Sequence, residues 1–163
     1  MAAGACLANR GTDEWDLSEF DALDSVDILA RLIYSEARGE SLQGKRGVAH
    51  VVANRKKKNS TEFGGGTVKG VALKKYQFSG MTTSSARCPD TAAQAWKDSL
   101  SIAGNSGTNP IGNCLWFNTN AKYKERVTLK NGVEYYTHPG STAKKVTQKY
   151  VIGNHTFWLV EGY

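Results

Sequence analysis

The chain has 163 residues, 40% of them hydrophobic and 22% charged, and a formal net charge of +6. This length favours one compact domain, and no apolar run reaches the 18 or so residues of a membrane span. The charge is uneven, because residues 1–27 carry seven acidic side chains and one arginine, a net −6 that leaves +12 on the rest. A basic body favours a polyanionic partner, such as nucleic acid or a bacterial wall with its teichoic acids.

The three cysteines, Cys6, Cys88 and Cys114, include no C-x-x-C pair, which argues against a structural zinc site. Cys88 and Cys114 are candidates for a disulfide in an oxidising compartment, and free thiols are the alternative. Residues 1–7 are small and apolar but lack the basic region and the full apolar region of a signal peptide.

Residues 1–24 are predicted to form an acidic N-terminal lead-in, followed by a single domain over residues 25–163. From residue 8 onward the lead-in is polar around a few large apolar side chains, and we expect it to pack loosely on the domain. Those apolar side chains are Trp15, Leu17, Phe20 and Leu23.

Residues 25–38 are predicted to form a helix, capped by Asp24 or Ser25 and ended at Gly39 in a left-handed conformation. At about 100° per residue, Glu36 falls on the same apolar face as three core positions, Leu29, Leu32 and Ile33. Burial disfavours a charged carboxylate, so the pKa of Glu36 is expected to rise, as general-acid catalysis requires. The alternative is a structural ion pair with a nearby arginine.

A second helix is predicted from Leu42 to Lys57, capped by Ser41. Its buried face includes three valines, and Arg55 falls on the same face. The basic run at residues 55–58 is interpreted as a solvated helix end that complements the helix dipole.

Residues 59–70 are predicted to form a glycine-rich loop, and the polar residues 80–87 to form part of a groove wall. A third helix is expected from Pro89 or Asp90 to Ala103, ended by Gly104.

The last third of the sequence changes to strand patterns. A short buried strand is expected at 115–117, and Asn131-Gly132 predicts a tight hairpin between 127–130 and 133–136. Residues 145–152 and 155–160 form a second predicted hairpin around Gly153-Asn154. Helices followed by antiparallel strands indicate an α+β fold.

Several kinds of chemistry remain open from the residues alone. A zinc amidase would use the three histidines, His50, His138 and His155, and a cysteine–histidine pair is a further alternative. Beyond residue 27, only Glu36 and Glu40 are carboxylates close together in sequence. A glycosidase normally uses two carboxylates, whereas a transglycosylase can use one because a sugar hydroxyl is the acceptor.

Five segments, taken together, resemble the SleB/CwlJ family of cell wall hydrolases. The signature Y-x-E-A-R-G-E is matched at residues 34–40, V-A-x-V-x-x-N-R at 48–55 and Q-F-S at 77–79. An aromatic-Asn strand is matched at 115–118 and I-G-N-H-x-F at 152–157.

The resemblance implies a lysozyme-like fold related to lytic transglycosylases, cleavage of the MurNAc–GlcNAc β-1,4 bond of peptidoglycan, and Glu36 as catalytic acid. Thr119 departs from the family, which usually has proline there, and residues 121–140 look like an insertion. Without a signal peptide, we expect a phage-type lysin or a mature or truncated secreted protein that acts at the bacterial cell wall.

We therefore expect a lytic transglycosylase that forms 1,6-anhydro-MurNAc, as a monomer without cofactor, metal, membrane span or nucleic-acid partner. The alternatives are a hydrolytic muramidase, an N-acetylmuramoyl-L-alanine amidase, and a basic module that only binds wall polymer or nucleic acid. The expected glycan-binding residues are Tyr34, Glu40, Gln77, Phe78, Ser79, Trp116, Asn118 and His155.

Overall fold

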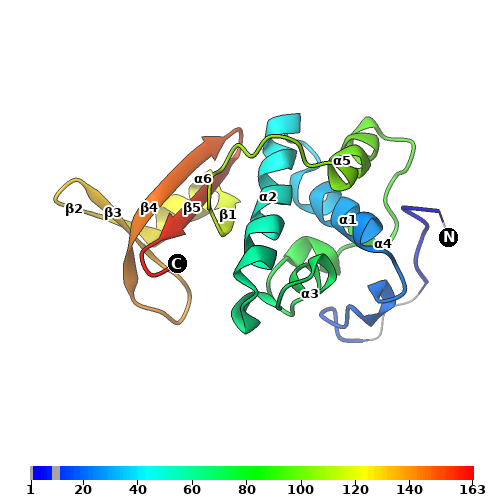
Figure 1. The fold of residues 1–163 in the computed structure, drawn as a ribbon, viewed down its shortest axis with the longest axis horizontal. Helices are drawn as coiled ribbons and strands as arrows, with labels where there is room; N and C mark the ends of the chain where they lie inside the picture. Colours follow the sequence, from blue (N-terminus) through cyan, green and yellow to red (C-terminus); the bar gives the residue numbers. More distant parts are fainter. Residues whose placement is uncertain (1, 9–11) are drawn as a thin grey trace.

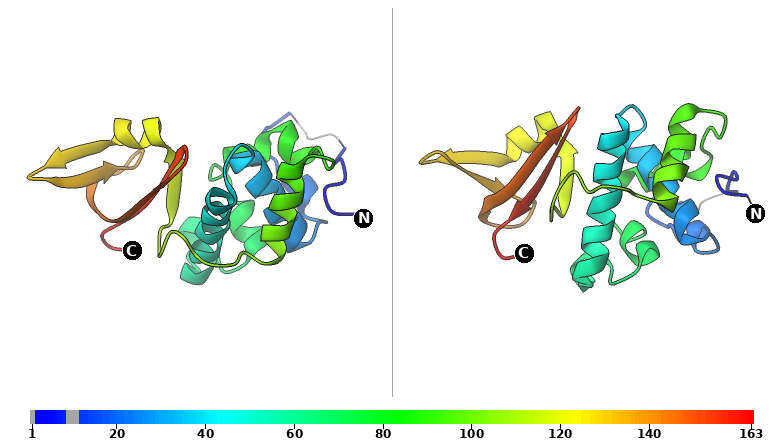
Figure 2. Two further views of the ribbon diagram at one scale, coloured as in Figure 1. Left: turned by 90° about the horizontal axis from the view of Figure 1, so that it is seen from above. Right: turned by 45° about the horizontal axis from the view of Figure 1, so that its top comes forward.

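The computed structural model describes residues 2–8 and 12–163. Helices form one end of the molecule and an antiparallel sheet forms the other, and α2 lies on the side of the helices that faces the sheet (Figures 1 and 2). The predicted α+β class is confirmed. Among the described residues, no helix combines the length and the apolarity needed to cross a membrane.

The helical part contains the three predicted helices, the first two with nearly the predicted bounds. Its longer helices are α1 (Ser25–Ala37), α2 (Leu42–Lys58) and α5 (Gln94–Gly104). Short helical segments lie before α1 and between α2 and α5: η1 (Ser18–Phe20) comes first, and η2 (Thr61–Phe63), α3 (Val68–Ala72), η3 (Ser79–Thr82) and α4 (Ser84–Arg87) follow α2. Asp24 and Ser41 cap α1 and α2, each accepting a backbone N–H three residues on. A short oxygen-bearing side chain satisfies a free amide there, as the sequence predicted.

Two predictions about helix ends are wrong. Gly39 is not among the residues with positive φ; α1 instead ends in a turn in which the Glu40 N–H donates to the Ala37 carbonyl. The helix α5 begins at Gln94 rather than near Asp90. Asp90 instead closes a local turn, because its side chain accepts from the Ala92 N–H and its carbonyl accepts from the Ala93 N–H.

The strands form one five-stranded sheet in the order β1-β5-β4-β3-β2, with every neighbouring pair antiparallel. Their bounds are β1 (Trp116–Thr119), β2 (Val127–Lys130), β3 (Val133–Thr137), β4 (Ala143–Ile152) and β5 (His155–Val160). Both predicted hairpins are confirmed. Asn131 and Gly132 have φ of 54° and 77°, as a tight hairpin turn between β2 and β3 requires.

One helix in this part was missed by the sequence analysis. The segment α6 (Asn120–Arg126) follows β1 and is capped by Thr119, whose side chain accepts from the Lys122 N–H. Its Tyr123 is buried against Trp158 of the sheet, with ring centroids 5.2 Å apart. The residue that departs from the family pattern therefore starts a helix that covers the sheet.

The main core lies within the helical part and extends to β5 through Phe157 and Leu159. Gly47 of α2 approaches β5 so closely that a Cβ there would lie 2.7 Å from the Phe157 ring. This contact sets the spacing between α2 and the sheet, and hence the width of the space between them.

The N-terminal lead-in packs more tightly than predicted. Leu17, Phe20 and Leu23 are buried in the main core, and Phe20 is 0% exposed. The prediction of loose packing is therefore wrong for the described residues of this segment. Residues 9–11 and residue 1, which the prediction also covered, lie outside the described residues.

Cys6 forms a disulfide with Cys88, and Cys114 is a buried free thiol. The predicted pairing of Cys88 with Cys114 is therefore wrong. The segment that contains Cys6 is also held by the buried Arg31 side chain, which donates to the Ala5 carbonyl and pairs with Asp27. A disulfide partner depends on this tertiary contact, which spacing in the sequence does not reveal.

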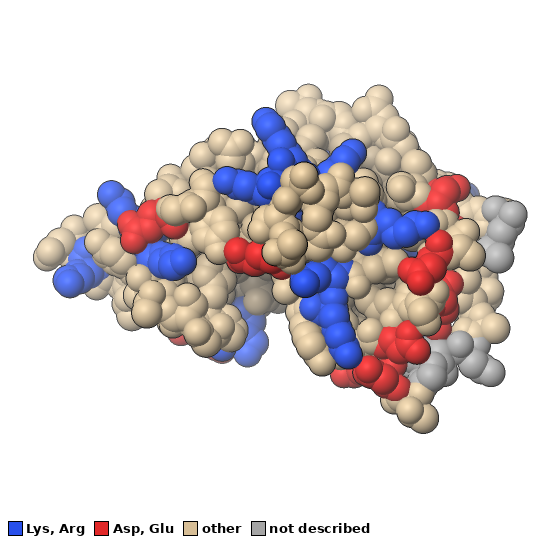
Figure 3. All heavy atoms as spheres, turned by 60° about the horizontal axis from the view of Figure 1, so that its bottom comes forward, with Lys and Arg blue, Asp and Glu red and all other residues tan. Residues whose placement is uncertain are grey.

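The acidic and basic side chains are also distributed unevenly over the surface of the molecule. Acidic side chains gather at the end of the molecule that carries the N-terminal segment, while lysines and arginines spread over the middle and the sheet end (Figure 3). The acidic lead-in is therefore a charged cap on one end of a basic molecule.

Candidate active site

A cavity of about 320 Å³ lies where α1, α2, the segment before η3, and the paired strands β1 and β5 meet. It brings together six of the nine predicted site residues: Glu36, Gln77, Phe78, Ser79, Asn118 and His155. Arg55, Phe117 and Thr119 also line it. These residues come from segments up to 119 positions apart, so the fold assembles the site.

Glu36 lies in the last turn of α1, half-buried at the wall of the cavity. The backbone N–H of Gly80 donates to its Oε1 at 3.0 Å. Burial raises the pKa of Glu36, while the Gly80 hydrogen bond and the charge of Arg55 lower it in part, and the net shift is upward. Among the described residues that line the cavity, Glu36 is the only carboxylic acid.

Arg55 is 4% exposed and lies in the centre of this region. Its guanidinium stacks on the rings of Phe63 and Phe78, 4.9 and 4.8 Å from their centroids. It donates to the Leu115 carbonyl at 2.8 Å and to Oε1 of Gln77 at 3.0 Å. Burial lowers the pKa of Arg55 to about 10, so it keeps its charge at neutral pH. The prediction of a solvated end is therefore wrong for Arg55.

Two amide side chains have their oxygens occupied by protein donors. Arg55 has only N–H donors, so it fixes the oxygen of Gln77 toward itself and leaves the NH₂ group outward. The Thr119 N–H likewise donates to Oδ1 of Asn118 at 2.8 Å. Both exposed amides can therefore offer N–H donors to the cavity, where carbonyl and hydroxyl oxygens of a ligand would accept them.

His155 begins β5 and is 8% exposed. Burial lowers its pKa, although the charge of Glu40 acts in the opposite direction, so the ring is neutral near pH 7. Its Nδ1 is buried and finds no hydrogen-bond partner among the residues that the structure describes. The edge of the ring contacts Phe117, with centroids 5.3 Å apart. A neutral ring nitrogen is thus available beside the cavity.

Three predicted glycan-binding residues do not line this cavity. Tyr34 is 3% exposed and packs edge-on against Trp96 of α5, so it belongs to the core. Glu40 accepts two hydrogen bonds from Asn154, at 2.9 and 3.0 Å, and so anchors the turn that precedes His155. Trp116 instead lines a neighbouring cavity.

The sequence analysis missed Arg55, Phe117 and Thr119 as site residues. A signal for Arg55 was present, because it shares a helix face with buried valines, which is unusual for a solvated cation. Phe117 lies in the aromatic-Asn segment matched at 115–118, and Thr119 follows that segment directly, so both flank Asn118 in β1.

The histidines do not form a metal site. His50 contacts the Gly107 carbonyl, His138 lies against Trp116, and His155 lines the Glu36 cavity. Over residues 2–8 and 12–163, no group of three or more His, Cys, Asp or Glu side chains is placed to hold a metal ion. The donor set that a histidine-based amidase would need is therefore not assembled by the described residues.

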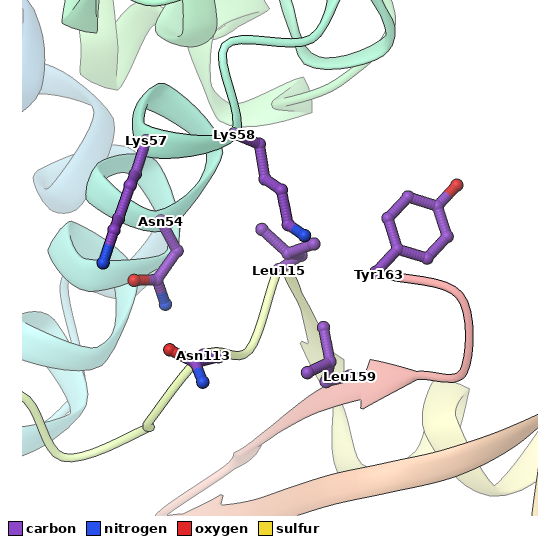
Figure 4. Close-up of a pocket in the computed structure, with 7 residues that line it drawn as sticks. All are labelled: Asn54, Lys57, Lys58, Asn113, Leu115, Leu159 and Tyr163. Carbon is purple, nitrogen blue, oxygen red and sulfur yellow. The ribbon is translucent and has the colours of Figure 1, made fainter.

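A separate cavity, of about 330 Å³, lies between the end of α2 and the sheet (Figure 4). It is lined by Asn54, Lys57, Lys58, Asn113, Leu115, Leu159 and Tyr163. Asn54 donates to the carbonyls of Gly112 and Cys114, which is a structural role. The described lining includes no carboxylate, so acid–base chemistry of the kind that Glu36 offers belongs to the other cavity.

The helical part and the antiparallel sheet meet at a cavity with one shielded carboxylic acid, a group that can serve in acid–base catalysis. The family model described as Cell Wall Hydrolase matches residues 39–158, so the chain belongs to this family and is an enzyme that degrades peptidoglycan. The matched span begins three residues after Glu36, so the case for Glu36 depends on the geometry of the cavity.

Two solved structures resemble the chain. The catalytic domain of the germination-specific lytic transglycosylase SleB from Bacillus anthracis is 23% identical, with a TM-score of 0.54 over 85% of this chain and 96% of that one. The catalytic domain of the Bacillus cereus SleB protein is 20% identical, with a TM-score of 0.48 over 93% of this chain and 95% of that one. The first likeness confirms the predicted lysozyme-like fold. No curated protein matches the sequence.

Proposed function

We propose that the protein is a lytic transglycosylase that cleaves the MurNAc–GlcNAc β-1,4 bond, with Glu36 as the acid and then the base. The observation that carries this proposal is one half-buried carboxylic acid, with a raised pKa, in a cavity lined by amide donors. The resemblance to a structure described as a lytic transglycosylase supports it.

In the first step, protonated Glu36 donates its proton to the glycosidic oxygen, and the bond between that oxygen and C1 of MurNAc breaks. Because the Gly80 N–H donates to Oε1, the proton is carried by Oε2. The electron pair of the broken bond stays with the departing GlcNAc oxygen, and positive charge develops on the MurNAc ring.

In the second step, the C6 hydroxyl of the same MurNAc attacks C1, and Glu36, now a carboxylate, takes the hydroxyl proton. This step forms the 1,6-anhydro ring and restores the protonated acid, so one carboxyl group completes the cycle. The Gly80 N–H and the nearby charge of Arg55 stabilise the carboxylate between the two steps.

The surrounding polar residues hold the glycan. The NH₂ groups of Gln77 and Asn118 are placed to donate to the N-acetyl carbonyl or to ring hydroxyls, and Ser79 and His155 supply further polar contacts. Phe78 is mostly buried under Arg55, so its contribution is to shape the floor of the cavity.

A transglycosylase fits the cavity better than a hydrolytic muramidase. Both standard hydrolytic mechanisms use a second carboxylate across the bond, at about 5 Å or about 6.5–9.5 Å from the first. The described lining offers no second carboxylate, and Glu40, the nearest in sequence, is held by Asn154. Attack by a sugar hydroxyl needs no separate base, because Glu36 serves in both steps.

Digestion of purified peptidoglycan, followed by mass analysis of the soluble products, tests the proposal. Wild-type protein is expected to release muropeptides with anhydro-MurNAc ends, lighter by one water than hydrolytic products. Glu36→Gln should release none while keeping the folded circular dichroism spectrum, and the exposed Glu161→Gln should digest like wild type. Reducing MurNAc ends would favour the muramidase, and free stem peptides the amidase.

A further inference from the structure

A second cavity, of about 530 Å³, lies beside the Glu36 cavity, and Gln77 lines both. It lies between the helical part and the loop that joins β3 to β4. The described residues that line it are Glu62, Phe63, Tyr76, Gln77, Trp116, His138, Pro139, Ser141, Lys144 and Tyr163. The shared amide places the two cavities side by side, and the proposed reaction at Glu36 makes no use of the second one.

Tyr76 is the most unusual residue of this cavity. It is 68% exposed and has a φ of 70°, which non-glycine residues with a large side chain rarely adopt. Trp15 of the lead-in contacts its ring edge-on, with centroids 5.3 Å apart, and the neighbouring Lys75 pairs with Asp13. A strained backbone that holds an exposed aromatic ring at a cavity indicates a binding role.

The opposite wall is also aromatic, and the two charged side chains in the described lining, Glu62 and Lys144, are of opposite sign. Trp116 lies 4.5 Å from the ring of His138 and 4.8 Å from that of Tyr163, measured between centroids. The Tyr163 hydroxyl lies 2.9 and 2.8 Å from the two oxygens of Glu62 and shares its one proton between them, which fixes the position of that carboxylate. Burial lowers the pKa of His138 to about 4, so its ring is neutral, and its Nε2 has no described hydrogen-bond partner.

These features match a sugar chain better than a charged peptide. Pyranose rings present flat C–H faces that lie on aromatic rings, and their hydroxyls and N-acetyl groups exchange hydrogen bonds with amides and neutral imidazoles. We propose that this second cavity binds the sugar residues of the same glycan strand that adjoin the bond held at Glu36, with Tyr76 as the stacking residue. This inference rests on the proposed function, since it assigns the neighbouring sugars of that substrate.

Binding of peptide-free glycan strands to the full chain tests the inference. The parent for this experiment is Glu36→Gln, which is expected to bind strands without cutting them, and tryptophan fluorescence or calorimetry reports the affinity. Adding Tyr76→Gly removes the ring and also relieves the positive φ, so stability should not fall. We expect the affinity for strands of six or more sugars to fall between about twofold and tenfold, the range for losing one stacked aromatic contact.

The matched control is Tyr150→Thr, which removes another exposed tyrosine, on β4, outside this cavity. It should leave the affinity for long strands unchanged. Equal affinity of Tyr76→Gly and its parent for long strands would overturn the inference, as would competition by free stem peptide against the glycan. If wild-type protein yields anhydro products while Tyr76→Gly binds normally, only the second cavity is misassigned; failure of the parent to bind any glycan contradicts both proposals.

Discussion

The backbone N–H of Gly80 donates to Oε1 of Glu36 at 3.0 Å, and the two residues are also in close van der Waals proximity. A Cβ at Gly80 would lie 2.5 Å from the Ser35 hydroxyl oxygen and 3.1 Å from the Glu36 carboxyl carbon. The absence of a side chain at residue 80 therefore allows the backbone amide to reach the acid.

Gly80→Ala is expected to lower activity more than stability. The added methyl group must push η3 away from α1, which weakens the hydrogen bond to Glu36 and costs about 1–3 kcal/mol of folding free energy. The turnover number on peptidoglycan should fall at least tenfold, since the acid loses its orientation. Gly39→Ala, where a Cβ meets nothing within 4 Å, is the matched control and should retain turnover.

The raised pKa of Glu36 predicts a basic limb in the pH–rate profile. The acid must start protonated, so the turnover number should fall as pH rises through the raised pKa.

The stability of the fold should also depend on the ionisation of Glu36. Because the pKa is higher in the folded protein than in the unfolded chain, where it is near 4.5, the protonated group contributes its full stability below 4.5. That contribution is lost as pH rises through the folded pKa. Glu36→Gln should therefore unfold at a higher temperature than wild type at pH 7, and the difference should shrink as pH falls through the raised folded pKa and reach its minimum below about 4.5. A constant difference across pH would contradict this assignment.

Local signals predicted much of the fold. The caps of α1 and α2 and the Asn131-Gly132 turn depend on neighbouring residues alone, so the sequence reveals them. By contrast, the segment after Asp90 forms a turn in place of helix, and α6 depends on the burial of Tyr123 against the sheet. Tertiary contacts of this kind override local propensity.

The candidate site was predictable where helical periodicity carried the information. The period of α1 placed Glu36 beside core leucines, but it gave no reason to expect that α5 would bury Tyr34 from another side. Arg55 was on an apolar face, yet the three lysines that follow it made the whole run look solvated. Which faces of a helix are buried depends on elements far along the chain, and the periodicity within that helix does not identify those elements.

Arg55→Met is expected to reduce both stability and substrate affinity. The variant leaves the Leu115 carbonyl without its donor and frees the Gln77 amide to rotate, although it keeps apolar contact with Phe63 and Phe78. An unsatisfied buried carbonyl costs about 1–3 kcal/mol.

Thermal unfolding and the KM for glycan strands measure the two effects of Arg55→Met. The adjacent Lys56→Met removes an exposed cation and should change neither quantity. Equal effects of the two substitutions would show that only net charge matters at this end of α2.

Glu40→Gln tests whether this carboxylate orders the turn before His155. Burial acts to raise the pKa of Glu40, but two hydrogen bonds from Asn154, the charge of Lys45 and the charge that His155 gains in acid outweigh it, and the net shift is downward. A lowered pKa stabilises the fold above the unfolded value, and this stabilisation is lost as pH falls through the folded pKa.

The loss in Glu40→Gln should be roughly 1 kcal/mol at pH 7, because the contact is open to solvent, and should disappear in acid. Chemical unfolding at pH 7 and pH 3 measures it, with Glu125→Gln as the exposed control. A variant as unstable at pH 3 as at pH 7, relative to wild type, would mean that ionisation of Glu40 has no part in holding the turn.

Reduction of the Cys6–Cys88 disulfide is expected to lower stability without abolishing activity. The bond joins residues 82 positions apart, and closing a loop of that length stabilises a fold by about 2–5 kcal/mol. The N-terminal segment lies at the opposite end of the helices from the sheet (Figure 1), so the Glu36 cavity should survive its release. Thermal unfolding with and without reductant, compared with Cys6→Ser, measures the effect.

Cys114 is the internal control for this experiment. Burial raises its pKa to about 12, so it should react with thiol reagents only after unfolding. If instead one thiol of the oxidised, folded protein reacts readily, or Cys6→Ser is as stable as wild type, the pairing of Cys6 with Cys88 is wrong.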